Sequence, residues 1–221
     1  MRIERIINEP VPSNTYILYK EDSGSCIIID PGSKCCTSLI EKIEDLHLSP
    51  EYILLTHEHF DHIWGCNTII ERYGSKIICS QKCKEKIGVP QNYYNELYYN
   101  DSTSYSISNV FKTVEELGYE FLFDGVKIKF IMTPGHSSSS ICIETSFGIF
   151  TGDTMMNGYK PLILKRHEGS IIEFKKSIDK LFVSYPLSTI IYPGHGDPFE
   201  ISEVRDFYLR YFEKQKQKAC L

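Results

Sequence analysis

Several features that would place this 221-residue chain in a familiar class are missing from its sequence. No apolar run reaches the roughly 18 residues that a membrane-spanning helix needs, and the opening MRIERIINEP lacks the apolar core of a secretory signal. Basic residues are not in excess, because the net charge is −5, and nucleic acids or anionic membranes call for a basic face. We therefore expect a cytoplasmic protein with a small-molecule substrate and with neither a nucleic-acid nor a membrane partner.

The sequence also lacks a disulfide or zinc-finger pattern, although it contains eight cysteines. No CxxC pair occurs, and Cys79 and Cys83, which are four apart, lie away from the histidine clusters. A chain of this length buries enough surface to fold without disulfide staples. We interpret the cysteines as small, buried apolar residues in a reducing compartment.

Repeats and low-complexity linkers are missing as well, and the length suits a single domain over residues 1–221. A stretch from about 87 to 118 interrupts the regular pattern of the chain, because it carries five tyrosines but little periodicity. Such a stretch is either a lid or binding loop or an insertion packed on the body. The sequence does not indicate an oligomeric state.

Strands and helices alternate in both halves of the chain. β-branched and aromatic runs predict strands at 15–19, 26–30, 52–56 and 76–79, and then at 119–123, 126–133, 140–144, 148–151 and 189–192. Ser38 with Glu41 and Ser170 with Glu173 have the spacing of capping boxes, and further helices are expected over about 61–73 and from Ser202. Two facing mixed sheets with helices on their outer faces, an α/β fold of the αββα sandwich type, would bury every apolar face.

Metal-ligand residue types are concentrated directly after the apolar strand Ile53–Thr56. Residues 57–62 read His-Glu-His-Phe-Asp-His, so that three histidines and an aspartate follow one strand end. His57 and His59, two apart in an extended turn, can hold one ion, and Asp61 and His62 can face a second. Imidazole and carboxylate ligands suit zinc, with iron or manganese as alternatives.

Three later strands end in the same way. Each runs into a glycine that is followed at once by His136, Asp153 or His195, in the segments TPGHS, TGDT and YPGHG. Glycine permits a sharp turn and a close approach of the backbone. One such strand end is an ordinary turn, but four that present histidine or aspartate alike indicate a metal site.

In this order, HxHxDH, PGHS, GDT and PGHG resemble the metallo-β-lactamase superfamily over nearly the whole chain. The resemblance implies that His57, His59 and His136 bind one metal and that Asp61, His62 and His195 bind another. It implies further that Asp153 bridges the two ions together with a hydroxide that Asp61 orients, so that Asp61 and Asp153 are the catalytic residues. Two divalent ions so held would keep a residual positive charge that favours an anionic substrate.

Within the superfamily, an aspartate at the position of Asp153 resembles the pattern of the glyoxalase II-like branch. The true β-lactamases have a cysteine or a non-bridging serine at this position. Residues 165–169, KRHEG, resemble the Lys-x-Tyr-Glu-Gly segment that contacts glutathione in glyoxalase II, but His167 replaces its tyrosine. Asp197 replaces a second family tyrosine. We therefore expect a glyoxalase II-like hydrolase of a small ester or thioester, with Lys165 and Arg166 as contacts for an anionic substrate.

Other functions remain open at this point. A persulfide dioxygenase of the same fold would hold one iron with His57, His59 and an aspartate such as Asp153. A phosphodiesterase of the RNase Z type is disfavoured by the acidic balance and by the lack of a basic recognition arm. A binding protein without catalysis is disfavoured because every ligand position is filled.

Overall fold

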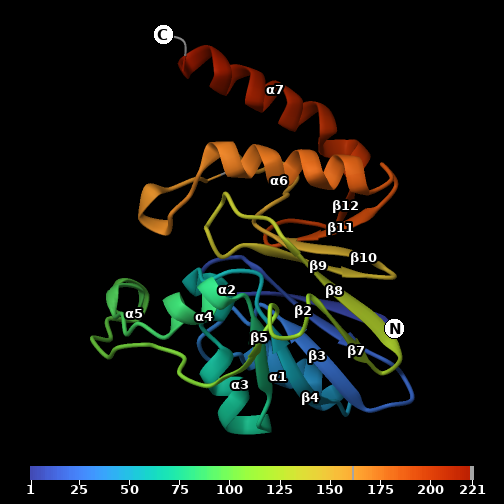
Figure 1. Cartoon of the computed structure of the whole chain (residues 1–221). Coiled ribbons are helices and arrows are strands. Elements are labelled where there is room, and N and C mark those ends of the chain that lie inside the picture. Colours follow the sequence, from blue (N-terminus) through green and yellow to red (C-terminus); the bar gives the residue numbers. More distant parts are fainter. Residues whose placement is uncertain (161, 220–221) are drawn as a thin grey trace.

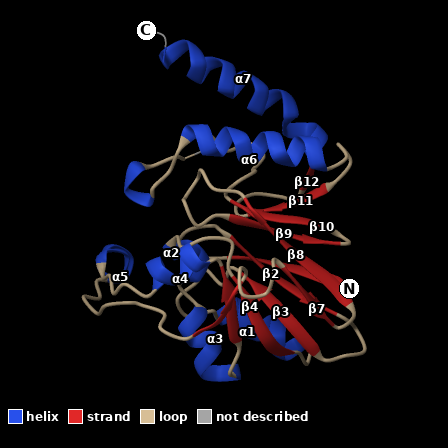
Figure 2. Ribbon diagram, in the orientation of Figure 1, coloured by secondary structure: helices blue, strands red, loops and turns tan. Residues whose placement is uncertain are grey.

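The computed structural model describes residues 1–160 and 162–219. Two six-stranded sheets lie face to face, and helices cover their outer faces (Figure 1). Figure 2 shows the two layers of strands between the helices. The αββα sandwich expected from the sequence is confirmed.

The first sheet is built by the N-terminal part of the chain, with its strands in sequence order. Its strands are β1 (Arg2–Ile7), β2 (Asn14–Tyr19), β3 (Ser25–Ile29), β4 (Ser49–Leu54), β5 (Lys76–Cys79) and β6 (Val110–Thr113). Strands β1 to β3 are antiparallel neighbours, whereas β3 to β6 run parallel. The parallel strands end at one edge, and this edge carries the residues after Leu54.

The second sheet also has six strands, in the order β12-β11-β10-β9-β8-β7. Its strands are β7 (Glu120–Phe123), β8 (Val126–Met132), β9 (Ile141–Thr145), β10 (Gly148–Gly152), β11 (Ile190–Pro193) and β12 (Phe199–Glu200). Only the β10–β11 pair is parallel. Residues 153 and 194 onward therefore leave the sheet at the same edge.

Three apolar layers hold the sandwich together. One fills the space between the sheets and includes Leu18, Ile29 and Phe150. The second packs α1 (Thr37–Asp45), α3 (Cys66–Tyr73) and α4 (Gln81–Ile87) on the first sheet. The third packs α6 (Ile171–Ser184) and α7 (Ile201–Ala219) on the second sheet. At roughly 25 cal/mol per Å² of buried apolar surface, these layers are the main stabilising contribution.

Two expected helix boundaries differ from the structure. Helix α1 begins at Thr37 with Cys36 at its N-cap, so the Ser38–Glu41 capping box does not form. The helix expected over 61–73 is divided into α2 (Phe60–Ile63) and α3, with Gly65 between them. A side chain at Gly65 would collide with Cys36 Sγ and with the Ser33 carbonyl, so the chain needs glycine at this close approach.

The tyrosine-rich stretch contains more regular structure than its sequence indicates. Helix α5 (Tyr93–Tyr99) projects beside α2 and α4, and β6 closes the edge of the first sheet (Figure 1). The Tyr94 ring stacks on Phe60 with centroids 3.8 Å apart, next to the ligand segment. That the chain forms one domain and that this stretch is an insertion both stay predictions.

None of the helices in the described parts of the chain is long and apolar enough to cross a membrane.

Candidate metal centre

The seven predicted ligand residues converge between the two sheets, at the edge where the parallel strands end. Their potential ligand atoms form two adjoining groups, with the members of each group within 4.8 Å of one another. The groups are His57, His59, His136 and Asp153, and Asp61, His62 and His195. Their role as metal ligands stays a prediction, but the structure brings every one of them together.

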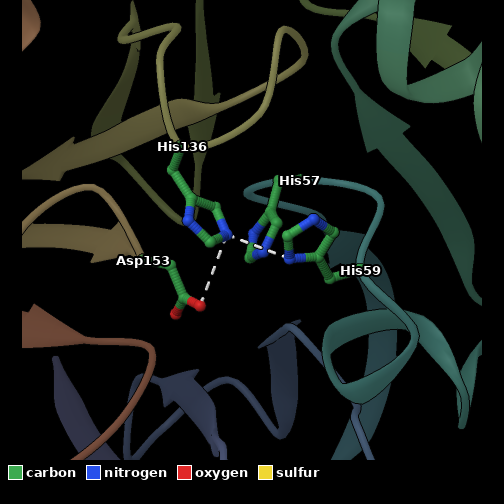
Figure 3. A group of neighbouring side chains, drawn as sticks. All are labelled: His57, His59, His136 and Asp153. Carbon is green, nitrogen blue, oxygen red and sulfur yellow. Dashed lines mark hydrogen bonds and ion pairs between the residues drawn. The ribbon is translucent and has the colours of Figure 1, made fainter. Parts of the chain in front are cut away.

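The first group surrounds the Nε2 atom of His136 (Figure 3). This nitrogen lies 2.9 Å from His59 Nδ1 and 3.5 Å from Asp153 Oδ2. The His57 ring packs at 4.5 Å from His59 and 4.9 Å from His136, centroid to centroid. Three imidazoles and one carboxylate oxygen thus face a common point, as they do around a zinc ion.

The second group shares Asp153 with the first. His62 Nε2 lies 3.4 Å from Asp153 Oδ1 and 3.8 Å from Asp61 Oδ2. His195 Nε2 lies 3.6 Å and 3.3 Å from the same two oxygens. The two oxygens of Asp153 therefore point to different groups, Oδ2 to the first and Oδ1 to the second.

Glycine makes this arrangement sterically possible. A Cβ atom at Gly194 would collide with Asp153 Oδ1 and with the His62 ring. Gly152 has a φ of +48°, and a Cβ atom there would collide with the Thr56 side chain. The glycines that precede Asp153 and His195 in the sequence thus let two strand ends meet at one point.

The ring nitrogens that face away from the centre are oriented by other groups. His62 Nδ1 donates to Asp30 Oδ2 at 2.9 Å, and the hydroxyl of Thr56 donates to the same oxygen at 2.5 Å. Because that hydroxyl proton is directed to Asp30, Thr56 Oγ1 accepts from His57 Nδ1 at 3.0 Å. Asp30 therefore sets the tautomer of one imidazole in each group and leaves both Nε2 lone pairs directed inward.

The buried polar atoms without partners fit divalent ions. Among the described residues, four buried side-chain atoms have no hydrogen-bond partner, and all four belong to these ligands: His57 Nε2, His59 Nε2, His62 Nε2 and Asp153 Oδ1. An unpaired buried polar atom costs ~1–3 kcal/mol, so such atoms are rarely left unsatisfied. Three of the four face into the two groups, where a cation would satisfy them.

The pKa values of Asp153 and His62 are shifted by the charges that surround them at the centre. Burial alone would raise the pKa of Asp153, but the charges of His62, His136 and His195 hold it well below its usual value. Burial would lower the pKa of His62, but Asp153 and Asp61 raise it well above its usual value. The two shifts have opposite directions because the Asp153 carboxylate and the His62 imidazole lie next to each other.

Two carboxylates that contact the candidate site were not anticipated from the sequence. Asp30 follows β3 in the segment Asp-Pro-Gly, and the strand-end rule that found the other ligands would have found it too. Glu58 lies between two ligands and is buried, where it accepts from Lys86, Ser137 and Ser139. No local signal distinguishes Glu58, because its partners come from distant segments.

A cavity of about 310 Å³ opens beside the first group. Its walls include His59, Phe60, Tyr94, Arg166 and His167. The Arg166 guanidinium has no ion-pair partner among the described residues, so it can meet an anionic group. Lys165 is exposed and lies outside the residues that line this cavity. Of the two predicted substrate contacts, the structure thus places only Arg166 beside the centre.

Sequence comparisons point to one family. A family model described as the metallo-beta-lactamase superfamily matches residues 8–195. A hydroxyacylglutathione hydrolase of Klebsiella pneumoniae is 31% identical over 69% of this chain and 52% of its own length. Another from Salmonella arizonae is 26% identical over 84% of this chain and 63% of its own length. The chain therefore spans between half and two thirds of these relatives.

Solved structures share the whole sandwich. The crystal structure of BLEG-1 B3 metallo-beta-lactamase has a TM-score of 0.79 at 24% identity, covering 93% of this chain and 97% of that one. The crystal structure of TTHA1623 in a di-iron-bound form has a TM-score of 0.75 at 20% identity, covering 91% and 96%. At these identities the likeness concerns the fold alone.

Proposed function

The chain belongs to the metallo-beta-lactamase superfamily, and on this premise we propose that it is a two-metal hydrolase of a small ester or thioester. One observation carries the proposal: the two oxygens of Asp153 face two separate groups of inward-pointing imidazoles. A structural aspartate would need donors on both oxygens, whereas Asp153 Oδ1 has no hydrogen-bond partner within the described residues. A carboxylate shared by two cations accounts for this position.

The ligand sets follow from the two groups. His57, His59 and His136 would hold one ion, Asp61, His62 and His195 the other, and Asp153 both. When bound, the ions would act as Lewis acids that polarise the carbonyl and acidify water. We propose zinc because imidazole and carboxylate donors suit it, with iron or manganese as alternatives. A di-iron form of one structural neighbour supports iron as an occupant.

The other steps fall to residues of the chain. Asp61 Oδ2 lies 3.8 Å from His62 Nε2 and 3.3 Å from His195 Nε2, and Asp61 would orient the attacking water beside this group. Asp30 and Thr56 keep the imidazoles of His62 and His57 in one tautomer. Arg166, at the wall of the cavity, would bind an anionic part of the substrate. The aromatic rings of Phe60 and Tyr94 would pack on its apolar part.

Two findings favour a thioester. The hydroxyacylglutathione hydrolases among the relatives bear a name that describes cleavage of a glutathione thioester. The chain also has Arg166 at the wall of the cavity, where it would contact an anionic group of the thiol part of such a substrate. Because the chain spans only part of those relatives, the substrate stays a proposal. We further propose that the protein works in the cytoplasm.

The test combines metal content with hydrolysis. Protein expressed with zinc, manganese and iron supplements should carry close to two ions per chain by elemental analysis. It should hydrolyse an S-acylglutathione or a p-nitrophenyl ester, and Asp61→Ala should reduce the turnover by ~100-fold or more. Asp206→Ala, an exposed aspartate on α7, is the matched control and should leave turnover unchanged. A metal content near zero, or full activity in Asp61→Ala, would overturn the proposal.

The same protein preparation distinguishes the hydrolase from the dioxygenase alternative. If the protein is a dioxygenase, its iron-loaded form consumes oxygen in the presence of glutathione persulfide, whereas the proposed hydrolase does not.

A further inference from the structure

A lysine outside the ligand set joins the ligand segment to the wall of the cavity. Lys86, on α4, donates to the Glu58 carboxylate at 2.8 Å and to the His167 carbonyl at 3.3 Å. The same ammonium lies 3.3 Å from a carboxylate oxygen of Glu168. One side chain thus contacts two segments that are far apart in the sequence.

The Glu58 partner is firmly held. Its side chain is only 9% exposed, and it also accepts from Ser137 Oγ at 2.7 Å and from Ser139 Oγ. A carboxylate this buried needs a cationic partner away from water, and the Lys86 ammonium is that partner.

The second contact fixes a loop. The loop formed by residues 165–168 includes the short helix η1 (Lys165–His167) and supplies Arg166 and His167 to the cavity wall. Besides Lys86, the loop is tied by the hydroxyl of Ser138, which donates to Glu168, and by a main-chain hydrogen bond of 3.4 Å from Ser138 to His167. Ser138 belongs to the same turn as the ligand His136.

The loop matters because His59 differs from the other ligand imidazoles. The other four pair their outward nitrogen: His57 with Thr56, His62 with Asp30, His136 with the Leu162 carbonyl and His195 with the Pro12 carbonyl. The Nε2 atom of His59 is buried and has no hydrogen-bond partner among the described residues. The His167 ring packs edge-on against His59, with centroids 4.2 Å apart.

We propose that Lys86 is a positioning residue that holds the 165–168 loop, and with it the His167 ring, against the ligand His59. This inference rests on the proposed metal site. It adds a residue that determines how firmly the first ligand group is held in place. Lys86 touches none of the seven ligands. It acts through Glu58 on one side and through the loop on the other.

Removing the ammonium would affect both sides. Glu58 would keep its two serine donors but lose its cationic partner. Of the hydrogen bonds that the described residues show between the loop and other segments, those with Ser138 would remain. The His59 ring would then lose its lateral support from His167. Because residues that orient metal ligands typically contribute about 10- to 100-fold to metal affinity, the first group should bind its ion more weakly.

The experiment compares three variants on one helix. Lys86→Met removes the charge but keeps the length, Lys86→Arg keeps the charge, and Lys82→Met removes an exposed charge from the same helix. The readouts are the zinc dissociation constant by chelator competition, the visible absorption of the Co²⁺-loaded protein and hydrogen exchange of the 162–169 peptide. We expect Lys86→Met to raise the zinc dissociation constant about tenfold, to shift the Co²⁺ spectrum and to speed the exchange. Lys86→Arg should restore most of each change, and Lys82→Met should change none.

The inference is overturned if Lys86→Met keeps the zinc affinity and Co²⁺ spectrum of the unaltered protein, or if Lys82→Met alters them equally. Should Lys86→Met fail to fold, Lys86→Gln removes the charge and keeps a polar side chain. Faster exchange of the 162–169 peptide in Lys86→Gln supports the inference, and unchanged exchange contradicts it. If the unaltered protein binds no metal, the proposed function fails, whereas the exchange measurements still test the loop attachment.

Discussion

At the scale of single residues, the convergence of the candidate site residues was predictable because they follow strand ends in the sequence. His57, His136, Asp153 and His195 come after apolar runs with glycine or threonine at the turn, and parallel strands bring such ends together. The residues that orient the ligands were harder to find. Asp30 obeys the same rule but stands apart from any histidine, and Lys86 lies on a helix whose own sequence gives no reason to select it.

Asp30 allows a prediction about metal affinity. Three donors converge on its carboxylate: the amide and hydroxyl of Thr56 and Nδ1 of His62. An asparagine offers one acceptor oxygen, so Asp30→Asn must set an NH₂ group against at least one donor. Since His57 and His62 both depend on this carboxylate, we expect zinc affinity to fall about 10- to 100-fold. Isothermal titration with zinc measures this loss.

The control for this change is Asp45→Asn, an exposed aspartate at the end of α1, which should bind zinc normally. Equal affinity of Asp30→Asn and the unaltered protein would show that the tautomers are set elsewhere.

At the scale of elements, the sequence predicted central strands better than edges. The strand expected at 76–79 coincides with β5, whose last three residues are buried. In contrast, β1 and β6 were not anticipated, and both lie at the edges of the first sheet. An edge strand is partly exposed on both faces, as the burial of β1 shows, so its sequence lacks the alternation that marks a strand.

Of the two expected capping boxes, Ser170–Glu173 forms only its N-cap hydrogen bond, because the Ser170 amide donates to the Gly135 carbonyl, and Ser38–Glu41 does not form. Ser170 Oγ accepts from the Glu173 amide at 3.3 Å at the start of α6, whereas Ser38 lies within the first turn of α1. Ser170→Ala should lower the free energy of unfolding by about 1 kcal/mol, because one amide at the helix start loses its acceptor. Urea denaturation followed by circular dichroism gives the difference. Ser188→Ala, an exposed serine outside the helices, should change it by less than ~0.5 kcal/mol.

At the scale of the whole molecule, buried weak acids predict how stability varies with pH. Burial raises the pKa of Cys26, Cys36 and Cys142 to about 12 each, and it raises the pKa of Tyr16 and Tyr208. In the unfolded chain thiols ionise near ~8.5. Above about pH 9 the unfolded state therefore releases protons that the folded state retains, so the free energy of unfolding should fall steadily toward pH 12.

Denaturation in urea with a reducing agent, at about pH 8 and about pH 10, measures this fall. Cys142→Ala removes one of the acids and should make the fall shallower, although the smaller side chain lowers stability at every pH. Stability that stays constant over this interval would mean that the thiols ionise as easily in the folded protein as in the unfolded chain.

The proposed metal centre also joins the two sheets. His57, His59, Asp61 and His62 follow β4 of the first sheet, whereas His136, Asp153 and His195 follow β8, β10 and β11 of the second. An ion that binds only the folded protein stabilises it by about 2.7 kcal/mol when its concentration is 100 times its dissociation constant. Chelation should therefore lower the melting temperature by several degrees, and added zinc should restore it. Asp153→Asn lacks the carboxylate that both groups share, so its melting temperature should respond little to either treatment. Suppose that chelation removes the zinc but leaves the melting temperature of the unaltered protein unchanged. The sheets would then be held together by their apolar layer alone.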